Sequence, residues 1–147
     1  SSQSLIYTDL FTETMLLYCG ASHPLFGADH AALTWDALRA HQFAGLGYHS
    51  PNMELSHSAR LPRKATGFDQ ESIATLILSG RYLGFLPDHY AEGFERRGLM
   101  QAVQPARFFY RCQFVSVLRR SPAPSRAAQA LAQCLLQAHG GGPPPHD

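Results

Sequence analysis

The sequence predicts an α/β domain in which helices flank a mostly parallel sheet. Short apolar runs typical of buried strands alternate with segments of helical periodicity, and the loops between them are short. Ser, Thr, Asp or Pro stands where each helix would begin, and Gly stands where several would end. Strands and helices that alternate in this way favour parallel strands with helices on the faces of the sheet.

The first part of the chain predicts two strands and one short helix. Residues 1–14 are polar and irregular, whereas 15–19 form a solid apolar run, typical of a buried strand, that stops at Gly20. Thr34 is placed to accept a hydrogen bond at the start of a short helix. The apolar segment 43–48 predicts the second strand.

The middle of the chain has the clearest pattern. Ser50 followed by proline predicts the start of a helix, because proline suits the first helical position. A strand is predicted at 65–68, and Asp69 then caps a helix that Gly80 ends. The next strand is predicted at 82–86 and leads directly into another helix.

The last part of the chain departs from this rhythm. Residues 108–118 predict one strand of about 36 Å, roughly twice the usual length, so it either bends or passes from one lobe to another. A helix with an apolar stripe is predicted from Ser125 to about Ala138. The Gly- and Pro-rich end, 139–147, predicts a disordered tail.

Composition excludes several classes of protein. The chain has 147 residues, 45% of them hydrophobic and 16% charged, as expected for one ordinary globular domain. No apolar run is long enough to cross a membrane, and the first twenty residues lack the features of a secretory signal. The formal net charge is +1 and the cations are scattered, so no nucleic-acid-binding stripe is predicted.

Motifs for catalysis, cofactors and metals are missing from the sequence. The 3 cysteines form no CxxC pair, and we expect them to be small buried hydrophobic residues in a reducing cytoplasm. The 8 histidines show no metal-ligand spacing, and neither a GxSxG elbow nor a Gly-rich phosphate loop occurs. We therefore expect no catalytic residue, no cofactor and no metal.

The loops after the predicted parallel strands are the best places for a ligand. Ligands of open α/β sheets bind beyond the carboxyl ends of the strands, which here are the loops after Tyr48, Phe68 and Leu86. Two of these loops lead into helix N-termini, which suit an anion unless Asp69 and Asp88 already satisfy the free amides as caps. Both interpretations stay open for the helix ends. The aromatic, imidazole and hydroxyl groups of residues 48–50 are better suited to bind a small polar molecule.

Several segments also occur in the order and spacing of one known family. The strongest runs from Glu71 through Ser79 and Gly80 to Pro87, where a hydrophobic helix ends in glycine and a hydrophobic strand ends in proline. Supporting segments are 10–13, 16–20, 23–25, Leu38 with Phe43, 98–99 and 125–136. Over roughly residues 5–138 the chain resembles the effector-binding domain of LysR-type transcriptional regulators.

The resemblance implies two Rossmann-like lobes of the type II periplasmic-binding-protein fold, with a small-molecule inducer bound between them. It divides the chain into the end of the first lobe with a hinge-crossing strand (1–20), the second lobe (21–107), a return hinge strand with the closing helix of the first lobe (108–138), and the tail (139–147). The first part of lobe one and the winged helix-turn-helix would lie outside these residues.

The resemblance also implies a site and partners. Together with the strand-end residues, it predicts effector contacts from Gly47, Tyr48, His49, Ser50, Phe68, Asp69, Phe85 and Pro87. The expected partners are a small-molecule effector, DNA only through the winged helix-turn-helix, and further copies in a homodimer or homotetramer. No membrane contact and a cytoplasmic location are expected. Because the apolar stripe of the last helix would be uncovered, the isolated chain is predicted to dimerise or aggregate.

Two alternatives remain at this stage. One is the solute-binding lobe of a periplasmic transport receptor, against which the unpaired cysteines argue. The other is an enzyme built on the same kind of lobe, for which the sequence offers no catalytic constellation.

Overall fold

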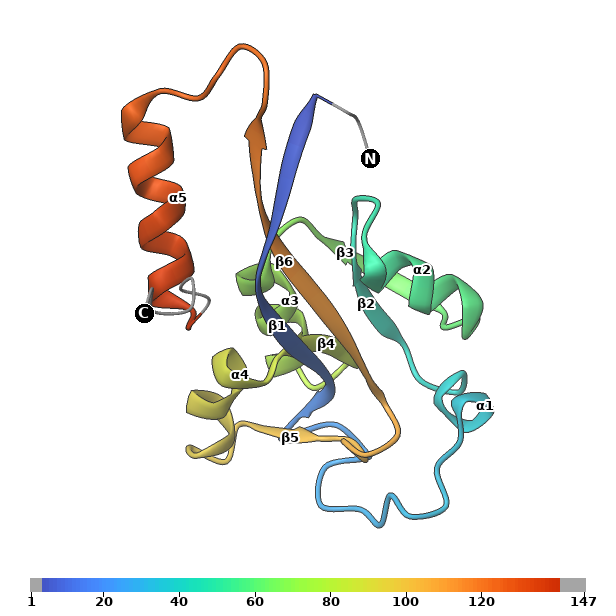
Figure 1. The fold of residues 1–147 in the computed structure, drawn as a ribbon. Helices are drawn as coiled ribbons and strands as arrows, with labels where there is room; N and C mark the ends of the chain where they lie inside the picture. Colours follow the sequence, from blue (N-terminus) through green and yellow to red (C-terminus); the bar gives the residue numbers. More distant parts are fainter. Residues whose placement is uncertain (1–3, 141–147) are drawn as a thin grey trace. The chain divides into compact units, whose positions relative to one another are not determined.

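The computed structural model describes residues 4–140, which fall into two compact units (Figure 1). The central unit is Thr14–Arg111, and the terminal unit combines the residues before Thr14 with those after Arg111. The chain therefore passes from one unit to the other inside two strands, β1 and β6. In chain order the elements are β1 (Leu5–Gly20), α1 (Trp35–Leu38), β2 (Phe43–Leu46), α2 (Pro51–Ser58), β3 (Arg63–Gly67), α3 (Gln70–Leu78), β4 (Gly84–Pro87), α4 (Asp88–Glu95), β5 (Met100–Ala102), β6 (Phe109–Arg119) and α5 (Arg126–Ala138).

The strands of the central unit form two sheets that meet at one bridge. One sheet has the order β4-β1-β5, with both ladders antiparallel, and the other is the parallel pair β2-β3. Phe43 and Leu83 form a parallel bridge between β2 and the start of β4. Two backbone hydrogen bonds support this bridge, since Ala44 donates to Leu83 at 2.8 Å and Leu83 donates to Gln42 at 2.9 Å.

The prediction of a mostly parallel sheet is wrong for the main sheet. The rule behind the prediction, that strands joined by crossover helices run parallel, nevertheless explains the directions of the strands. β2, β3 and β4 are joined by crossover helices and run the same way, and β5 also runs this way because both it and β4 are antiparallel to β1. The one reversed strand, β1, lies between β4 and β5, so its ladders with both are antiparallel. The sequence pattern shows the crossovers but not which strand is inserted between which neighbours.

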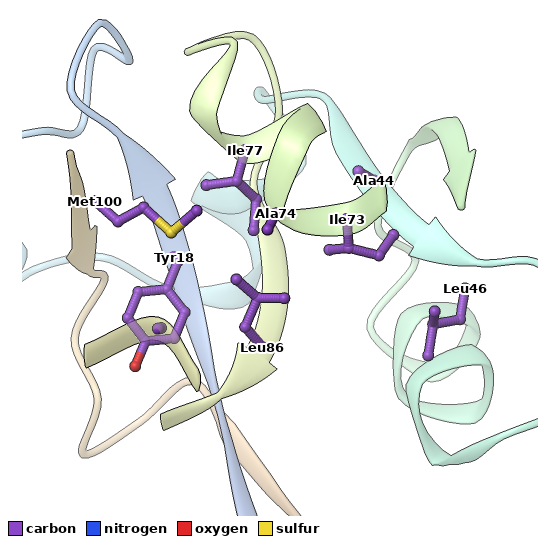
Figure 2. Packing of buried hydrophobic residues seen from close by; sticks show 9 residues of the cluster. Tyr18, Ala44, Leu46, Ile73, Ala74, Ile77, Leu86 and Met100 are labelled. Atoms are coloured by element: carbon purple, nitrogen blue, oxygen red, sulfur yellow. The ribbon is translucent and has the colours of Figure 1, made fainter. Parts of the chain in front are cut away.

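The core of the central unit lies between its strands and the helices α3 and α4 (Figure 2). Tyr18 of β1 and Leu86 of β4 project into it from neighbouring strands, and Ile73 and Ile77 meet them from one face of α3. The helical spacing of four residues between these isoleucines places both on that face. The buried cluster comprises Tyr18, Ala44, Leu46, Ile73, Ala74, Ile77, Leu86, Ala91 and Met100.

The start of the chain is more regular than predicted. Residues 1–14 were expected to be irregular, but from Leu5 onward they are part of β1. β6 supplies the partner: Ser4 accepts from the Arg120 amide at 2.8 Å, and Thr12 donates to Gln113 at 2.6 Å. A polar strand is stable here because a second strand, about a hundred residues away in sequence, satisfies its backbone, which local patterns cannot reveal.

The helix α5 belongs to the terminal unit and has no fully buried residue. It begins next to Ser125 as predicted, and the Ser125 hydroxyl caps it by accepting from the Ala128 amide at 3.2 Å. Leu135 and Leu136 are half-buried, whereas Leu131, part of the predicted stripe, is 62% exposed. Most of the predicted tail, 141–147, lies outside the described residues.

The expectation of buried cysteines also needs correction. Of the cysteines, only Cys19 is buried, while Cys112 is half-buried and Cys134 is exposed on α5. His23 is buried too, at 5% exposed, and its Nδ1 accepts a hydrogen bond from the Leu25 amide at 3.1 Å inside a tight turn.

Candidate functional site

The tips of three strands meet at one edge of the central unit. β2, β3 and β4 run in the same direction, so the loops that follow them leave from the same side. The reversed strand β1 brings its earlier residues to this edge, since Met15 lies opposite Pro87 at the end of β4. Strand tips that converge in this way are where α/β folds bind ligands. We call this side the tip edge.

Two exposed aromatic rings stand at the tip edge. Tyr48 follows β2 and is 46% exposed, and Phe68 follows β3 and is 71% exposed. A Cβ atom on Gly47 would lie 2.7 Å from Phe68 Cε1 and 2.7 Å from Thr66 Cγ2, so a larger residue there would displace the ring from this position. Large rings that are left in solvent at converging strand tips are suited to cover an apolar part of a ligand.

Ser50 and His49 continue the loop after β2. The Ser50 hydroxyl caps α2, accepting from the Met53 amide at 3.4 Å, and donates to the Tyr48 carbonyl at 3.2 Å. His49 Nε2 lies 3.3 Å from Glu54 Oε1, and both side chains are exposed. Ser50 therefore shapes the loop, while the His49 imidazole is presented to solvent beside a carboxylate.

Asp69 begins α3 beside Phe68. Its carboxylate accepts from the Ser72 amide at 2.7 Å, and the hydrogen bonds with the Ser72 side chain and backbone lower the pKa of Asp69. The sequence left open whether these helix ends bind an anion or are capped by their own aspartates. At α3 the Asp69 cap is present. At α4, Pro87 occupies the cap position without a side-chain hydrogen bond, but the Asp88 carboxylate accepts from the His89 amide at 2.7 Å.

The remaining predicted site residues, Phe85 and Pro87, are buried. Phe85 is 1% exposed and packs edge-on against Phe43 and Tyr110, with ring centroids 5.9 and 5.1 Å apart. Pro87 ends β4 opposite Met15. The structure thus brings residues 47 and 68 together at the surface and leaves Phe85 and Pro87 buried within β4.

Sequence reasoning missed two residues that hold the tip of β2. The Asn52 side chain is 3% exposed, and its Oδ1 accepts from the Leu46 amide at 3.0 Å. Arg63 Nη1 donates to the Leu46 carbonyl at 3.0 Å. Both backbone groups of the last β2 residue are therefore fixed by side chains, which sets where the loop with Tyr48 begins. Asn52 lies two residues after Ser50, and no sequence signal marks it.

A further missed feature is the amide of Gln70, at the start of α3. Its Oε1 is buried and has no hydrogen-bond partner within the described part of the chain. The charged residues of the tip-edge loops are acidic: Asp69, Glu71 and Asp88. Together with burial, the charges of Glu71 and Asp69 raise the pKa of Tyr90 on α4.

The residues 4–140 show no group of three His, Cys, Asp or Glu side chains that could hold a metal ion. Among these residues, no helix is long and apolar enough to cross a membrane.

Comparison with known proteins agrees with this geometry. Residues 1–140 match the family described as the LysR substrate binding domain. The chain belongs to this family. It is the effector-binding regulatory domain of a LysR-type transcriptional regulator, a family of transcription factors and not of enzymes.

The HTH-type transcriptional activator BauR of Pseudomonas aeruginosa is 31% identical over 131 residues. The match covers 89% of this LysR domain and 43% of BauR, so the chain spans less than half of that relative.

Solved LysR regulatory domains share the fold. The apo regulatory domain of HypT from Salmonella typhimurium has a TM-score of 0.69 at 15% identity, covering 94% of this chain and 68% of that one. MetR from N. meningitidis has a TM-score of 0.70 at 14% identity, with 95% and 66% covered. The regulatory domain of Synechocystis PCC6803 CcmR, solved in complex with 2-PG, has a TM-score of 0.68 at 16% identity, with 92% and 67% covered.

Proposed function

We propose that this LysR domain binds a small-molecule effector at the tip edge, through Tyr48, His49 and Phe68. The observation that carries the proposal is the pair of exposed aromatic rings on strand tips that converge. Gly47, Ser50 and Asp69 shape the loops that hold these rings, whereas Phe85 and Pro87 are buried in the neighbouring strand β4. The proposal also draws on CcmR, whose regulatory domain was solved with 2-PG.

Effector binding would act on DNA through the rest of the protein. A ligand that prefers one arrangement of the two lobes shifts the population toward it. β1 and β6, which each run from one unit into the other, would serve as the hinge strands. A winged helix-turn-helix outside these residues would read DNA in the cytoplasm, within a homodimer or homotetramer, in line with the name of BauR as an HTH-type activator.

Ligand binding can be tested with the chain itself. A panel of small carboxylic acids, amino acids and amines, with 2-PG as one member, is screened by thermal shift, and calorimetry gives the dissociation constant of each compound that binds. Phe68→Ala and Tyr48→Ala should each weaken binding at least about fivefold, because each removes an aromatic ring that the bound compound would cover. Leu78→Ala is the matched control, since Leu78 is 37% exposed at the far end of α3.

The control variant should bind like the unmodified chain. Equal affinities of the unmodified chain and its three variants for a bound compound would contradict the tip-edge site.

The regulator as a whole is tested by reading the codons that precede Ser1 in the gene. A winged helix-turn-helix is expected there, and an export signal would instead favour a transport receptor.

A further inference from the structure

A second concave site lies under α4. A cavity of about 370 Å³ opens between this helix and β1. Its lining comprises Leu16, Tyr18, Asp88, His89, Glu92 and Glu95. None of these residues belongs to the predicted effector set. We call this cavity the Tyr18 pocket.

The wall of the Tyr18 pocket is acidic. Asp88, Glu92 and Glu95 are spaced by four and three residues, so α4 presents all three carboxylates on one side. Asp88 Oδ1 accepts from the His89 amide at 2.7 Å and lies 3.6 Å from its Nδ1. Glu95 Oε1 accepts from the Ala102 amide at 3.3 Å. These bonds leave further lone pairs on each carboxylate.

The nearby cations do not neutralise this wall. Arg96 Nη1 lies 4.0 Å from Glu92 Oε1, and both side chains are mostly exposed, at 74% and 60%. Such an exposed pair is weak and easily exchanged. The Arg97 guanidinium instead lies over the Phe94 ring, 5.1 Å from its centroid. The pocket therefore keeps a negative potential.

The floor of the pocket carries a hydroxyl with no hydrogen-bond partner. Tyr18 is 0% exposed, and its Oη is buried without a partner within residues 4–140. Figure 2 shows the ring inside the core, with the oxygen pointing away from Ile73 and Ile77. Burial raises the pKa of Tyr18, and the charges of Glu95 and Asp88 raise it further, so the hydroxyl stays protonated. Tyr18 lines the same cavity as these two carboxylates. A buried polar group without a partner is destabilising unless something binds it.

We propose that the Tyr18 pocket binds the ammonium group of a small organic amine. An ammonium carries three N–H donors, which match the Tyr18 oxygen and two carboxylate oxygens from α4. An anion would be repelled by the three carboxylates, and a neutral ligand would leave their charge uncompensated. Because the carboxylates are not arranged as a metal site, an organic cation whose carbon chain can lie on Leu16 fits better. This site is separate from the proposed effector site.

The test uses three four-carbon probes of similar length. 1,4-Diaminobutane is a cation at pH 7, 1,4-butanediol is neutral and succinate is an anion. Calorimetry on the 147-residue chain should show binding of the diamine and none of the diol or succinate at about 10 mM. Absence of diamine binding at that concentration, or equal binding of the diol, would overturn the proposal.

Two variants locate the binding. Tyr18→Phe removes only the hydroxyl and keeps the ring in the core, and Glu92→Gln removes only a charge. Each should weaken diamine binding by about fivefold or more. Glu54→Gln, on α2, is the control for general surface charge and should bind like the unmodified chain.

The thermal midpoint of the ligand-free chain provides a second readout. Tyr18→Phe should leave it equal or raise it, because the variant removes an unpartnered buried hydroxyl. Unchanged diamine affinity in a folded Tyr18→Phe protein would assign the binding to the helix surface alone and reject the site.

Discussion

Asn52 is a buried amide whose role is to hold the end of a strand. Its Oδ1 accepts from the Leu46 amide at 3.0 Å, and the residue is 3% exposed. Asn52→Ala would leave this backbone donor without a partner in a buried position. We expect the free energy of unfolding to fall by about 1–3 kcal/mol, measured by urea denaturation.

Ser58→Ala is the matched control on the same helix. The Ser58 hydroxyl is exposed and bonds only within α2, to the Leu55 carbonyl at 3.0 Å. Its loss should change the free energy of unfolding by less than about 0.5 kcal/mol. Similar losses for both variants would mean that α2 as a whole, rather than the bond to β2, is being measured.

His23 links stability to pH. Burial, and then the neighbouring His41, lower the pKa of His23 to about 4 from 6.5. The rings are 5.0 Å apart, and Arg81 lines the same cavity, so a second positive charge is disfavoured there. The unfolded chain then binds more protons between pH 6.5 and 4, so stability is complete above pH 6.5 and falls as the pH drops toward 4.

The free energy of unfolding lost between pH 6.5 and 4 should amount to about 1–2 kcal/mol after allowance for solvent screening. His23→Asn keeps an oxygen acceptor for the Leu25 amide but cannot titrate. Urea denaturation at pH 7 and pH 4.5 should therefore show a smaller loss for His23→Asn than for the unmodified chain. The exposed His57→Asn should keep the full loss, and an unchanged pH dependence in His23→Asn would exclude His23 as its source.

At the scale of elements, the contact of β1 with α3 depends on Gly20. A Cβ atom there would lie 2.2 Å from the Ile77 carbonyl oxygen, which belongs to the backbone and cannot move aside. Gly20→Ala must therefore separate the strand from the helix. We expect a loss of about 3 kcal/mol or more in the free energy of unfolding, measured by urea denaturation.

Gly93→Ala should act in the opposite direction. Gly93 lies inside α4, and a Cβ atom there would meet nothing within 4 Å. Alanine is the better helix former, so a gain of about 0.5–1 kcal/mol is expected. If both variants were equally destabilised, the cost would come from the loss of glycine in general and not from the β1–α3 contact.

At the scale of the whole molecule, the outward side of α5 predicts self-association. Leu131 is 62% exposed and Cys134 is exposed, with alanines at 127, 130 and 138 on the same side. Sedimentation of the chain at tens of micromolar should show a dimer or larger species. Leu131→Gln should shift the distribution toward monomer, whereas a monomeric unmodified chain would contradict the prediction.

The features that depend on residues close together in the chain could be predicted from the sequence. Thr34, Ser50, Asp69 and Ser125 cap the helices where expected, because a cap is a contact between residues two or three positions apart. The sequence also indicated that the loops after β2, β3 and β4 leave from the same side, since crossover helices make those strands run in the same direction. Ligand binding at these loops stays a prediction. The order and spacing of several segments further predicted the LysR family, which the comparison confirmed.

The folded chain was needed for everything that depends on distant partners. The insertion of β1 between β4 and β5, and the pairing of β1 with β6, join segments about seventy to a hundred residues apart. The burial of Phe85 and the unpartnered hydroxyl of Tyr18 follow from those pairings. Periodicity shows which face of an element is apolar, but only packing selects the neighbour that covers it, and so determines which polar atoms are left without a partner.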